Sequence, residues 1–454
     1  MNGNHHTTAM LAGLLGGFAA VTAAAGSETV DVQAEIDALR SEINALRAES
    51  GQSWLDDTRR AEIEGIVQDV LADSATRTSY QDDASIAGWS KGFRLQSPDG
   101  NFLLKVGGQM QIRYVFNHAN DVPGSGSYLW GMENRRTKLQ FEGHVVDPSW
   151  TYRLKGAFAR GAGGFIGLDE AWIAKSLGDG VKVKVGQFKA PFMREELVSS
   201  SKQLTVERSI VNEYFNQGKS QGIQLSWKSD DFTAAAWAGD GLGARGLGPA
   251  RFNGQNTAWN ETATNYAFAG RGEWKFAGEW SQFKDFSSAR GSEFAGMVGL
   301  AGAVQRANQN IGAADGTIAG GVTADLTLEF SGASIFASVV WMNVDNPTDG
   351  VTNPYGFTVQ GGYFVAEDVE AFARYEYMDY DLENVPNRGT GRFNGCTVGA
   401  NWFLNPAVKF TMDWTINFDS LAAGAFVATS AGFRADQPGA SDQWALRAQL
   451  QLLF

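Results

Sequence analysis

From residue 101 to the C-terminus, hydrophobic and polar residues alternate in short segments that recur along the chain. Successive side chains of a strand point to opposite sides, so a period of two gives the strand an apolar face and a polar face. In the first segment the apolar face contains Leu104, Val106, Met110, Ile112, Tyr114 and Phe116. The last segment, residues 444–454, alternates in the same way. The pattern predicts an all-β chain.

The connections between these segments are alternately short and long. Short connections are expected at 147–149, 177–180, 229–231, 277–278, 331–332, 366–368 and 404–406. Long connections are expected at about 118–134, 161–167, 189–218, 240–264, 287–320, 344–356, 379–392 and 418–440. Fifteen connections join sixteen strands. An even strand number, with short turns at one end and long loops at the other, is typical of bacterial outer-membrane barrels.

Aromatic residues lie near the ends of several segments, among them Trp150, Trp227, Trp341 and Trp402, as in the girdles at membrane interfaces. A soluble β-sandwich or a lipocalin-like barrel is the competing fold, but it needs neither sixteen strands nor eight long loops. A closed barrel pairs every strand edge, as lipid requires. We therefore predict a sixteen-stranded antiparallel transmembrane β-barrel over residues 92–454, wide enough to hold a water-filled channel.

The N-terminal part of the chain has a different pattern. An apolar segment from Ala9 to Ala20, followed by small residues at Ala23 and Ala25, predicts a signal peptide over residues 1–25, although no Lys or Arg precedes it. A retained N-terminus is the alternative. Export would place the protein in the outer membrane of a bacterium.

Residues 28–80 carry helical spacing. Ile36, Leu39, Ile43 and Leu46 follow a heptad seam, and a second amphipathic pattern covers residues 63–71. We expect a short periplasmic helical or coiled-coil segment over 28–80, which either joins subunits or is a solvated linker. It could also contact peptidoglycan or another periplasmic partner. A polar linker at 81–91 leads into the barrel.

Composition narrows the possible functions. After the N-terminus there is no run of eighteen apolar residues, which excludes helical membrane spans. Cys396 is the single cysteine and only four histidines are present, so neither an intrachain disulfide nor a Cys/His metal site is expected. No Ser-His-Asp set can be placed, so we expect no enzyme, no cofactor and no nucleic-acid partner. Gly241 to Gly246 matches a dinucleotide-binding motif, but loop-like sequence follows where that fold requires a helix.

Charge is unevenly distributed along the chain. The formal net charge is −13, yet residues 91–228 hold 19 Lys and Arg against 12 Asp and Glu. Alternation directs the strand cations away from the apolar face, because a cation facing lipid at mid-depth costs about 2–4 kcal/mol. The predicted lumen cations are Lys105, Arg113, Arg136, Lys138, Arg153, Lys155, Lys182 and Lys184. A basic wall of this kind attracts and guides anions.

The later strands weaken the case for an anion-selective pore, because they carry acidic residues. The same alternation directs carboxylates into the lumen, namely Asp325, Glu329, Glu370, Glu376 and Asp413. A basic wall opposite acidic groups makes a transverse field, as in weakly selective general-diffusion porins. That function stays open beside anion selectivity, as does a structural outer-membrane protein tethered to the cell wall through residues 28–80.

Two stretches carry a resemblance to a known family. They are "GFRLQSPDGNFLLKVGGQMQ" (92–111) and "VGQFKAPFMREELVSSSKQLTVERSIVNEYF" (185–215). The chain resembles the phosphate-selective porin O and P family over about residues 90–454. The resemblance implies a sixteen-stranded, usually trimeric pore that passes small anions such as phosphate and whose third loop folds into the lumen. The terminal Phe454 resembles the barrel-assembly signal of outer-membrane proteins.

The predicted third loop supplies the candidate constriction. Ser199, Ser200 and Ser201 precede Lys202, and hydroxyl donors beside a cation suit a partly dehydrated oxyanion. Further cations are Lys189, Arg194 and Arg208. Each of them either meets the permeating solute or pairs with the neighbouring carboxylates Glu195, Glu196 and Glu207 and fixes the loop. The sequence leaves both roles open.

Overall fold

The computed structural model describes residues 37, 38, 40, 41, 86–89, 92–120, 126–158, 165–243, 258–260, 264–308, 316–347, 350–381, 391–419, 429–434 and 443–454. The chain divides into two compact units, Met1–Asp82 and Asp83–Phe454. In the first unit, the described residues 37, 38, 40 and 41 are helical. The signal peptide at 1–25 and most of the segment at 28–80 lie outside the described residues and stay predictions. Among the described residues, none of the helices is both long enough and apolar enough to span a bilayer.

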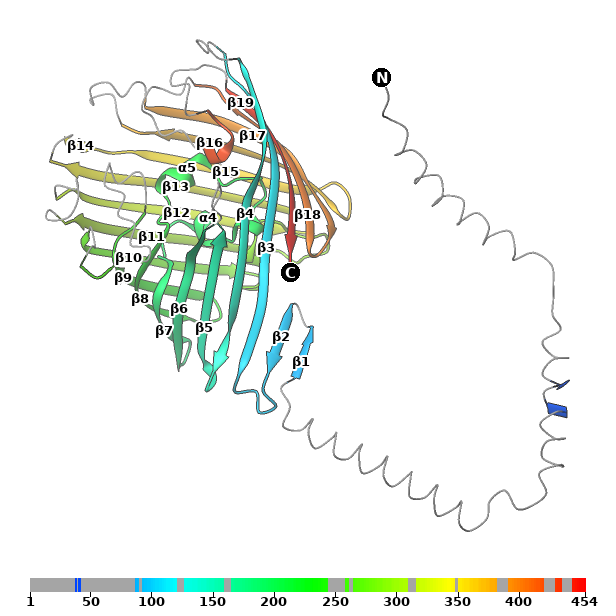
Figure 1. Ribbon diagram of the computed structural model, residues 1–454. Coiled ribbons are helices and arrows are strands. Elements are labelled where there is room, and N and C mark those ends of the chain that lie inside the picture. Colours follow the sequence, from blue (N-terminus) through cyan, green and yellow to red (C-terminus); the bar gives the residue numbers. More distant parts are fainter. Residues whose placement is uncertain are drawn as a thin grey trace, which may run out of the picture. The chain divides into compact units, whose positions relative to one another are not determined.

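The second unit contains a closed antiparallel barrel (Figure 1). Its sixteen strands are β3 (Leu103–His118), β4 (Tyr128–Val145), β5 (Asp147–Phe158), β6 (Ile166–Gly178), β7 (Val181–Lys189), β8 (Lys219–Lys228), β9 (Phe232–Gly239), β10 (Thr264–Ala277), β11 (Ala295–Ala307), β12 (Ile318–Phe330), β13 (Ala333–Asn346), β15 (Tyr355–Phe364), β16 (Val369–Asp379), β17 (Arg392–Asn405), β18 (Val408–Asn417) and β19 (Trp444–Leu453). Three short strands, β1 (Ile86–Trp89), β2 (Phe93–Gln96) and β14 (Gly350–Thr352), extend this sheet. The predicted sixteen-stranded barrel is confirmed.

The barrel closes on β3, where β19 pairs with residues 109–118 and β2 pairs with residues 103–106. Phe454 continues this pairing, since its carbonyl accepts a hydrogen bond from the Gly108 amide at 2.8 Å. The Phe454 ring lies over Gly108, where a Cβ atom would come within 2.2 Å of it. A side chain at residue 108 would therefore displace the ring from this position in the seam.

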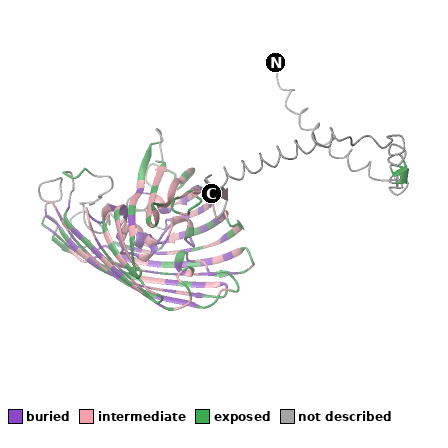
Figure 2. Ribbon diagram, turned by 90° about the horizontal axis from the view of Figure 1, so that it is seen from below, coloured by how far each residue is buried: buried purple, intermediate pink, exposed green. Residues whose placement is uncertain are grey.

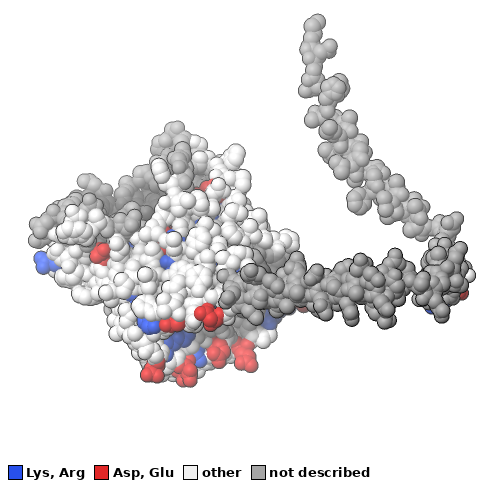
Figure 3. Space-filling view, turned by 60° about the horizontal axis from the view of Figure 1, so that its bottom comes forward, with Lys and Arg blue, Asp and Glu red and all other residues white. Residues whose placement is uncertain are grey.

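The alternation predicted from the sequence is visible along the strands, where buried and exposed residues follow one another (Figure 2). On β12, Thr323, Asp325 and Thr327 are buried and face inward, whereas Ile318 and Val322 are exposed on the outer face. Figure 3 shows an outer face that is largely free of charge, with charged residues gathered near one rim. This is the arrangement that lipid outside and polar groups inside require.

Residues 190–218, between β7 and β8, lie inside the barrel and are called loop 3 below. The loop contains α4 (Arg194–Leu197), η1 (Ser200–Lys202) and α5 (Ile210–Phe215). Its apolar residues Phe192, Met193, Ile210, Val211 and Phe215 are buried in one cluster with inward-facing residues of the opposite wall, namely Val340, Met342, Val344, Met378 and Phe393. The hydrophobic effect therefore fastens one side of loop 3 to strands β13, β16 and β17. The predicted inward folding of the third loop is confirmed.

Two neighbouring predicted connections are wrong. Strand β11 lies inside the long loop expected at 287–320, and the short turn expected at 277–278 is a segment of residues 278–294 that contains η3 (Gln282–Lys284). Strand β11 is rich in Gly and Ala, which give little hydrophobic alternation, so the strand has only a weak pattern in the sequence. The segment 278–294 contacts loop 3, where the Phe286 amide donates to the Lys202 carbonyl at 3.3 Å.

Candidate functional site

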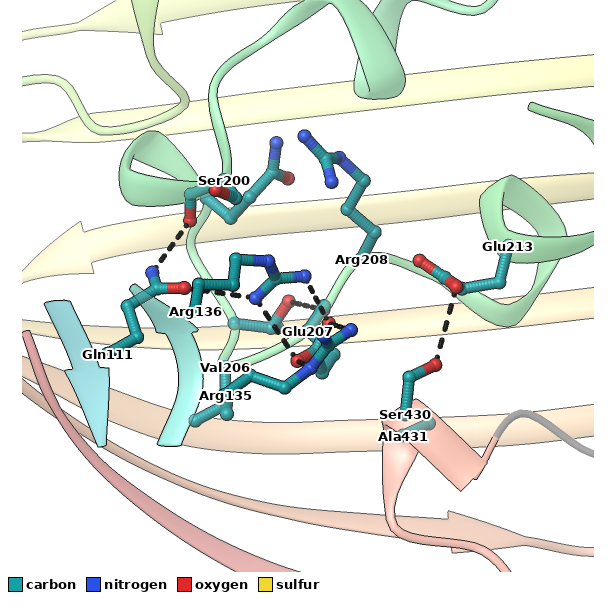
Figure 4. Close-up of polar contacts among 12 residues, drawn as sticks. Gln111, Arg135, Arg136, Ser200, Val206, Glu207, Arg208, Glu213, Ser430 and Ala431 are labelled. Atoms are coloured by element: carbon teal, nitrogen blue, oxygen red, sulfur yellow. Dashed lines mark hydrogen bonds and ion pairs between the residues drawn. The ribbon is translucent and has the colours of Figure 1, made fainter. Parts of the chain in front are cut away.

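The charged face of loop 3 is attached to the wall through a β-bulge in β4. Gln111 of β3 pairs with Arg136, and the next residue, Ile112, pairs with Asn134, so Arg135 is an extra residue. A bulge of this type directs two consecutive side chains to the same face. Arg135 and Arg136 both point into the lumen toward Glu207 of loop 3 (Figure 4). Strict alternation predicted Arg136 inward and missed Arg135.

Glu207 is fully buried and binds three arginines. Its carboxylate oxygens lie 2.9 Å from Arg113 Nη1, 2.5 Å from Arg135 Nε and 2.8 Å from Arg136 Nη2. Burial alone raises the pKa of Glu207, but the three guanidinium groups outweigh it and hold the pKa well below its usual value. Glu207 therefore stays ionised and joins loop 3 to β3 and β4.

A second bulge, in β6, creates another charged node on the wall. Lys155 of β5 pairs with Glu170 and Gly156 pairs with Leu168, so Asp169 is the extra residue and both carboxylates face inward. Asp169 binds Lys138 at 2.9 Å and also Lys219 of β8. Glu170 lies 3.3 Å from Arg153 and 3.8 Å from Lys155. Sequence reasoning missed Lys219, Asp169 and Glu170, because it assumed a regular pleat and gave no inward role to the start of β8.

Within loop 3 itself, Glu196 holds two of the predicted cations. Its carboxylate lies 3.0 Å from Lys189 Nζ and 3.3 Å from Arg208 Nε. Burial raises the pKa of Glu196, but Arg208 and Lys189 outweigh it and lower the pKa to about 2. Arg208 also donates to the Val198 carbonyl at 2.8 Å. These contacts fix the loop.

The other predicted residues of loop 3 contact different parts of the barrel. Arg194 lies 3.7 Å from Glu273 of β10, and Lys202 Nζ lies 2.9 Å from Asp285. Ser199 caps η1 through the Ser201 amide, and Gln109 Nε2 donates to Ser200 Oγ at 3.0 Å.

A cavity of about 400 Å³ lies between loop 3 and the wall formed by β4 to β8. Its basic lining consists of Arg136, Lys138, Arg153, Lys155, Lys184, Lys189, Arg208 and Lys219. Glu170 and Glu196 are the acidic residues of this lining, and Gln140, Trp172, Phe188, Leu197, Ser199 and Ser200 complete it. Of the predicted site residues, Lys105, Arg113, Lys182, Arg194, Ser201 and Lys202 do not line this cavity. The cavity offers eight cations against two carboxylates.

The acidic residues of the later strands do not line this cavity. Asp325 is paired with Arg271 at 2.8 Å, and Asp413 is paired with Arg447 at 2.6 Å. Both carboxylates are buried, and Asp413 Oδ2 also accepts a hydrogen bond from the Val206 amide of loop 3 at 2.9 Å. The transverse field expected from alternation is therefore weakened by local pairing.

Comparisons with known proteins agree with this geometry. The family model described as phosphate-selective porin O and P matches residues 104–417. The fold is similar to the anion-selective porin from Comamonas acidovorans, with 12% sequence identity, a TM-score of 0.52 and coverage of 77% of this chain and 99% of that chain. It is also similar to OmpF of Salmonella typhi in complex with daunomycin, with 12% identity, a TM-score of 0.51 and coverage of 81% of this chain and 100% of that chain. No curated protein matches the chain. At these identities the solved structures show the fold alone.

Proposed function

This chain belongs to the phosphate-selective porin O and P family, and we propose that it is an outer-membrane pore through which small anions, phosphate among them, diffuse. The observation that carries the proposal is the cavity beside loop 3, where eight cations face two carboxylates. The family and the fold are those of channel proteins, so we look for selectivity at this constriction and not for catalysis.

The lining suits passage of anions better than their capture. A unit charge pair at 4 Å is worth roughly 4 kcal/mol at an effective dielectric constant of 20, so several cations along one wall attract anions strongly. Most of these cations also bind a carboxylate, as Lys138 does with Asp169, which moderates the attraction. Conduction needs binding that is favourable enough for entry and weak enough for exit.

Phosphate fits the loop side of the cavity. Ser199 and Ser200 line the cavity together with Lys189 and Arg208. Hydroxyl groups and charged N–H donors are the groups that replace water around a phosphate oxygen. We place phosphate contact at these four residues, with Arg136 and Lys138 on the opposite wall.

The test is the reversal potential of the pore in planar bilayers across a KCl gradient, followed by addition of phosphate. We expect the potential to favour chloride and phosphate to reduce the chloride current. Lys138→Gln should weaken anion preference, whereas Lys105→Gln, whose side chain does not line the cavity, should leave it unchanged. A reversal potential that favours potassium would make the pore cation-selective and overturn the proposal.

The subunit count and the N-terminal segment complete the proposal. We infer a homotrimer, as the family resemblance implies, with residues 28–80 in the periplasm. Native mass spectrometry of the detergent-solubilised protein tests the trimer, and a monomer would refute it. Deleting residues 28–80 should leave conductance unchanged. Weakened attachment of the envelope in that variant would support contact of these residues with peptidoglycan.

A further inference from the structure

Lys184 differs from the other cations that line the cavity. Each of the other seven has a carboxylate within ion-pair distance, for example Lys189 with Glu196 and Lys138 with Asp169. Lys184 has no such partner among the residues that the structure describes, and the same holds for Lys182, two residues earlier on the same face of β7. Neither lysine is therefore neutralised by a direct ion pair within the described part of the chain.

Aromatic rings take the place of carboxylates around these lysines. The Lys184 ammonium lies 3.8 Å from the centroid of the Phe188 ring and 5.8 Å from that of Trp172. Lys182 Nζ and Arg153 Cζ lie 5.9 Å and 5.5 Å from the same Trp172 ring. Three cations thus gather around one indole. Cation–π contacts stabilise an ammonium group without neutralising it, so the mutual repulsion of these cations favours a bound anion.

Two of the three apolar lining residues of the cavity contact Lys184 in this way. Trp172, Phe188 and Leu197 are its apolar lining residues, and Leu197 comes from loop 3 while the other two belong to the wall. Phe188 is 2% exposed and backs the Lys184 ammonium, whereas Trp172 is only partly buried. An anion held by Lys184 therefore meets the Trp172 indole beside its charge, and Leu197 lines the same cavity.

We propose that Trp172, Lys184 and Leu197 form a subsite for carboxylates with a planar apolar body, of which benzoate is the simplest probe. The carboxylate would bind the Lys184 ammonium, and the ring would stack on Trp172 or fill the space toward Leu197. Inorganic phosphate gains nothing from apolar neighbours, because each of its oxygens needs a hydrogen-bond donor. The inference rests on the proposed anion pore and names a further class of solute for it.

The experiment compares two carboxylates in planar bilayers containing the full-length protein. Benzoate and acetate are each added to KCl, and the concentration that halves the chloride current is measured. Benzoate should act at a concentration about fivefold to tenfold lower than acetate, the size expected for one aromatic contact. In Trp172→Leu the two anions should become nearly equal, and in Lys184→Gln neither should block at low concentration.

Matched variants separate the possible outcomes. Trp227→Leu removes an indole that is 43% exposed on the outer face of β8, so it should keep the preference for benzoate. Lys184→Arg should keep it as well, since the charge is retained. If the wild-type pore favours chloride but benzoate and acetate block alike, the subsite is refuted and the anion pore stands. If the pore favours potassium, the proposed function itself fails.

Discussion

Replacing Glu207 by glutamine tests whether charge holds loop 3 against the wall. Glu207 Oε atoms bind Arg113, Arg135 and Arg136, all of which are buried or nearly so. Glutamine has a similar shape and can accept hydrogen bonds, but it carries no charge. The variant therefore leaves these three guanidinium groups with a single carboxylate within ion-pair distance among the described residues, Glu133, which already binds Arg113.

The expected loss of stability follows from the number of cations left without a partner. Removing one member of a buried ion pair costs about 3–5 kcal/mol, because the other charge stays desolvated. Arg113 keeps its ion pair with Glu133, so we expect Glu207→Gln to lower the free energy of unfolding by at least about 3 kcal/mol. The apolar cluster around Phe192 and Phe215 stays intact, so the loop should remain inside the barrel while its charged edge near Glu207 loosens.

Two measurements detect this loosening. The unfolding temperature in detergent should fall by about 5 °C, and single-channel current noise should rise as residues near Ser200 move at the constriction. The matched control is Glu213→Gln in α5, where a carboxylate accepts a hydrogen bond from Ser430 Oγ at 3.3 Å (Figure 4). Burial raises the pKa of Glu213, so neutralising it should cost little. The reasoning is refuted if Glu207→Gln is no less stable and no noisier than Glu213→Gln.

Three further predictions concern charge and packing. The pKa of Glu196 is lowered to about 2, so its contribution to stability is complete above its unfolded value of 4.5 and is lost as pH falls toward 2. The difference in unfolding temperature between the wild type and Glu196→Gln should therefore stay constant from pH 7 to about 5 and shrink below about pH 4, and a difference that already shrinks between pH 7 and 5 would contradict this assignment. Asp169→Asn removes the carboxylate that Lys138 and Lys219 share, so the reversal potential in a KCl gradient should shift toward stronger anion preference, and the unfolding temperature should fall. Unchanged selectivity would argue against passage of anions along this wall. Gly108→Ala places a methyl group where the Phe454 ring lies, so this variant should assemble into the barrel more slowly, as measured in a gel-shift assay. The control Gly131→Ala has nothing within 4 Å of the added Cβ and should assemble normally. Equal assembly of the two variants would refute the role of this close approach.

Regular alternation predicted the barrel well because each lipid-facing position must be apolar. It directed Arg136, Lys138 and Lys184 to the cavity that the structure contains. It failed where the pleat is interrupted, since one extra residue in a bulge turns a neighbouring side chain to the other face. Arg135 and Asp169 are such residues, and neither carries a sequence signal that distinguishes a bulge from a regular strand. The segment 278–294 was missed for another reason. The strand that follows it, β11, consists largely of Gly and Ala residues and therefore shows little alternation in the sequence.

The pairing of cations with carboxylates does not neutralise the constriction, because three of the carboxylates bind more than one cation each. Glu207 binds three arginines, Asp169 binds Lys138 and Lys219, and Glu196 binds Lys189 and Arg208. A shared carboxylate fixes two or three long side chains at once, and the group as a whole keeps a net positive charge. Positioning the loop and attracting anions are therefore compatible roles for the same residues. Arg136, Lys189 and Arg208 illustrate this, because they hold loop 3 in place and also line the passage beside it.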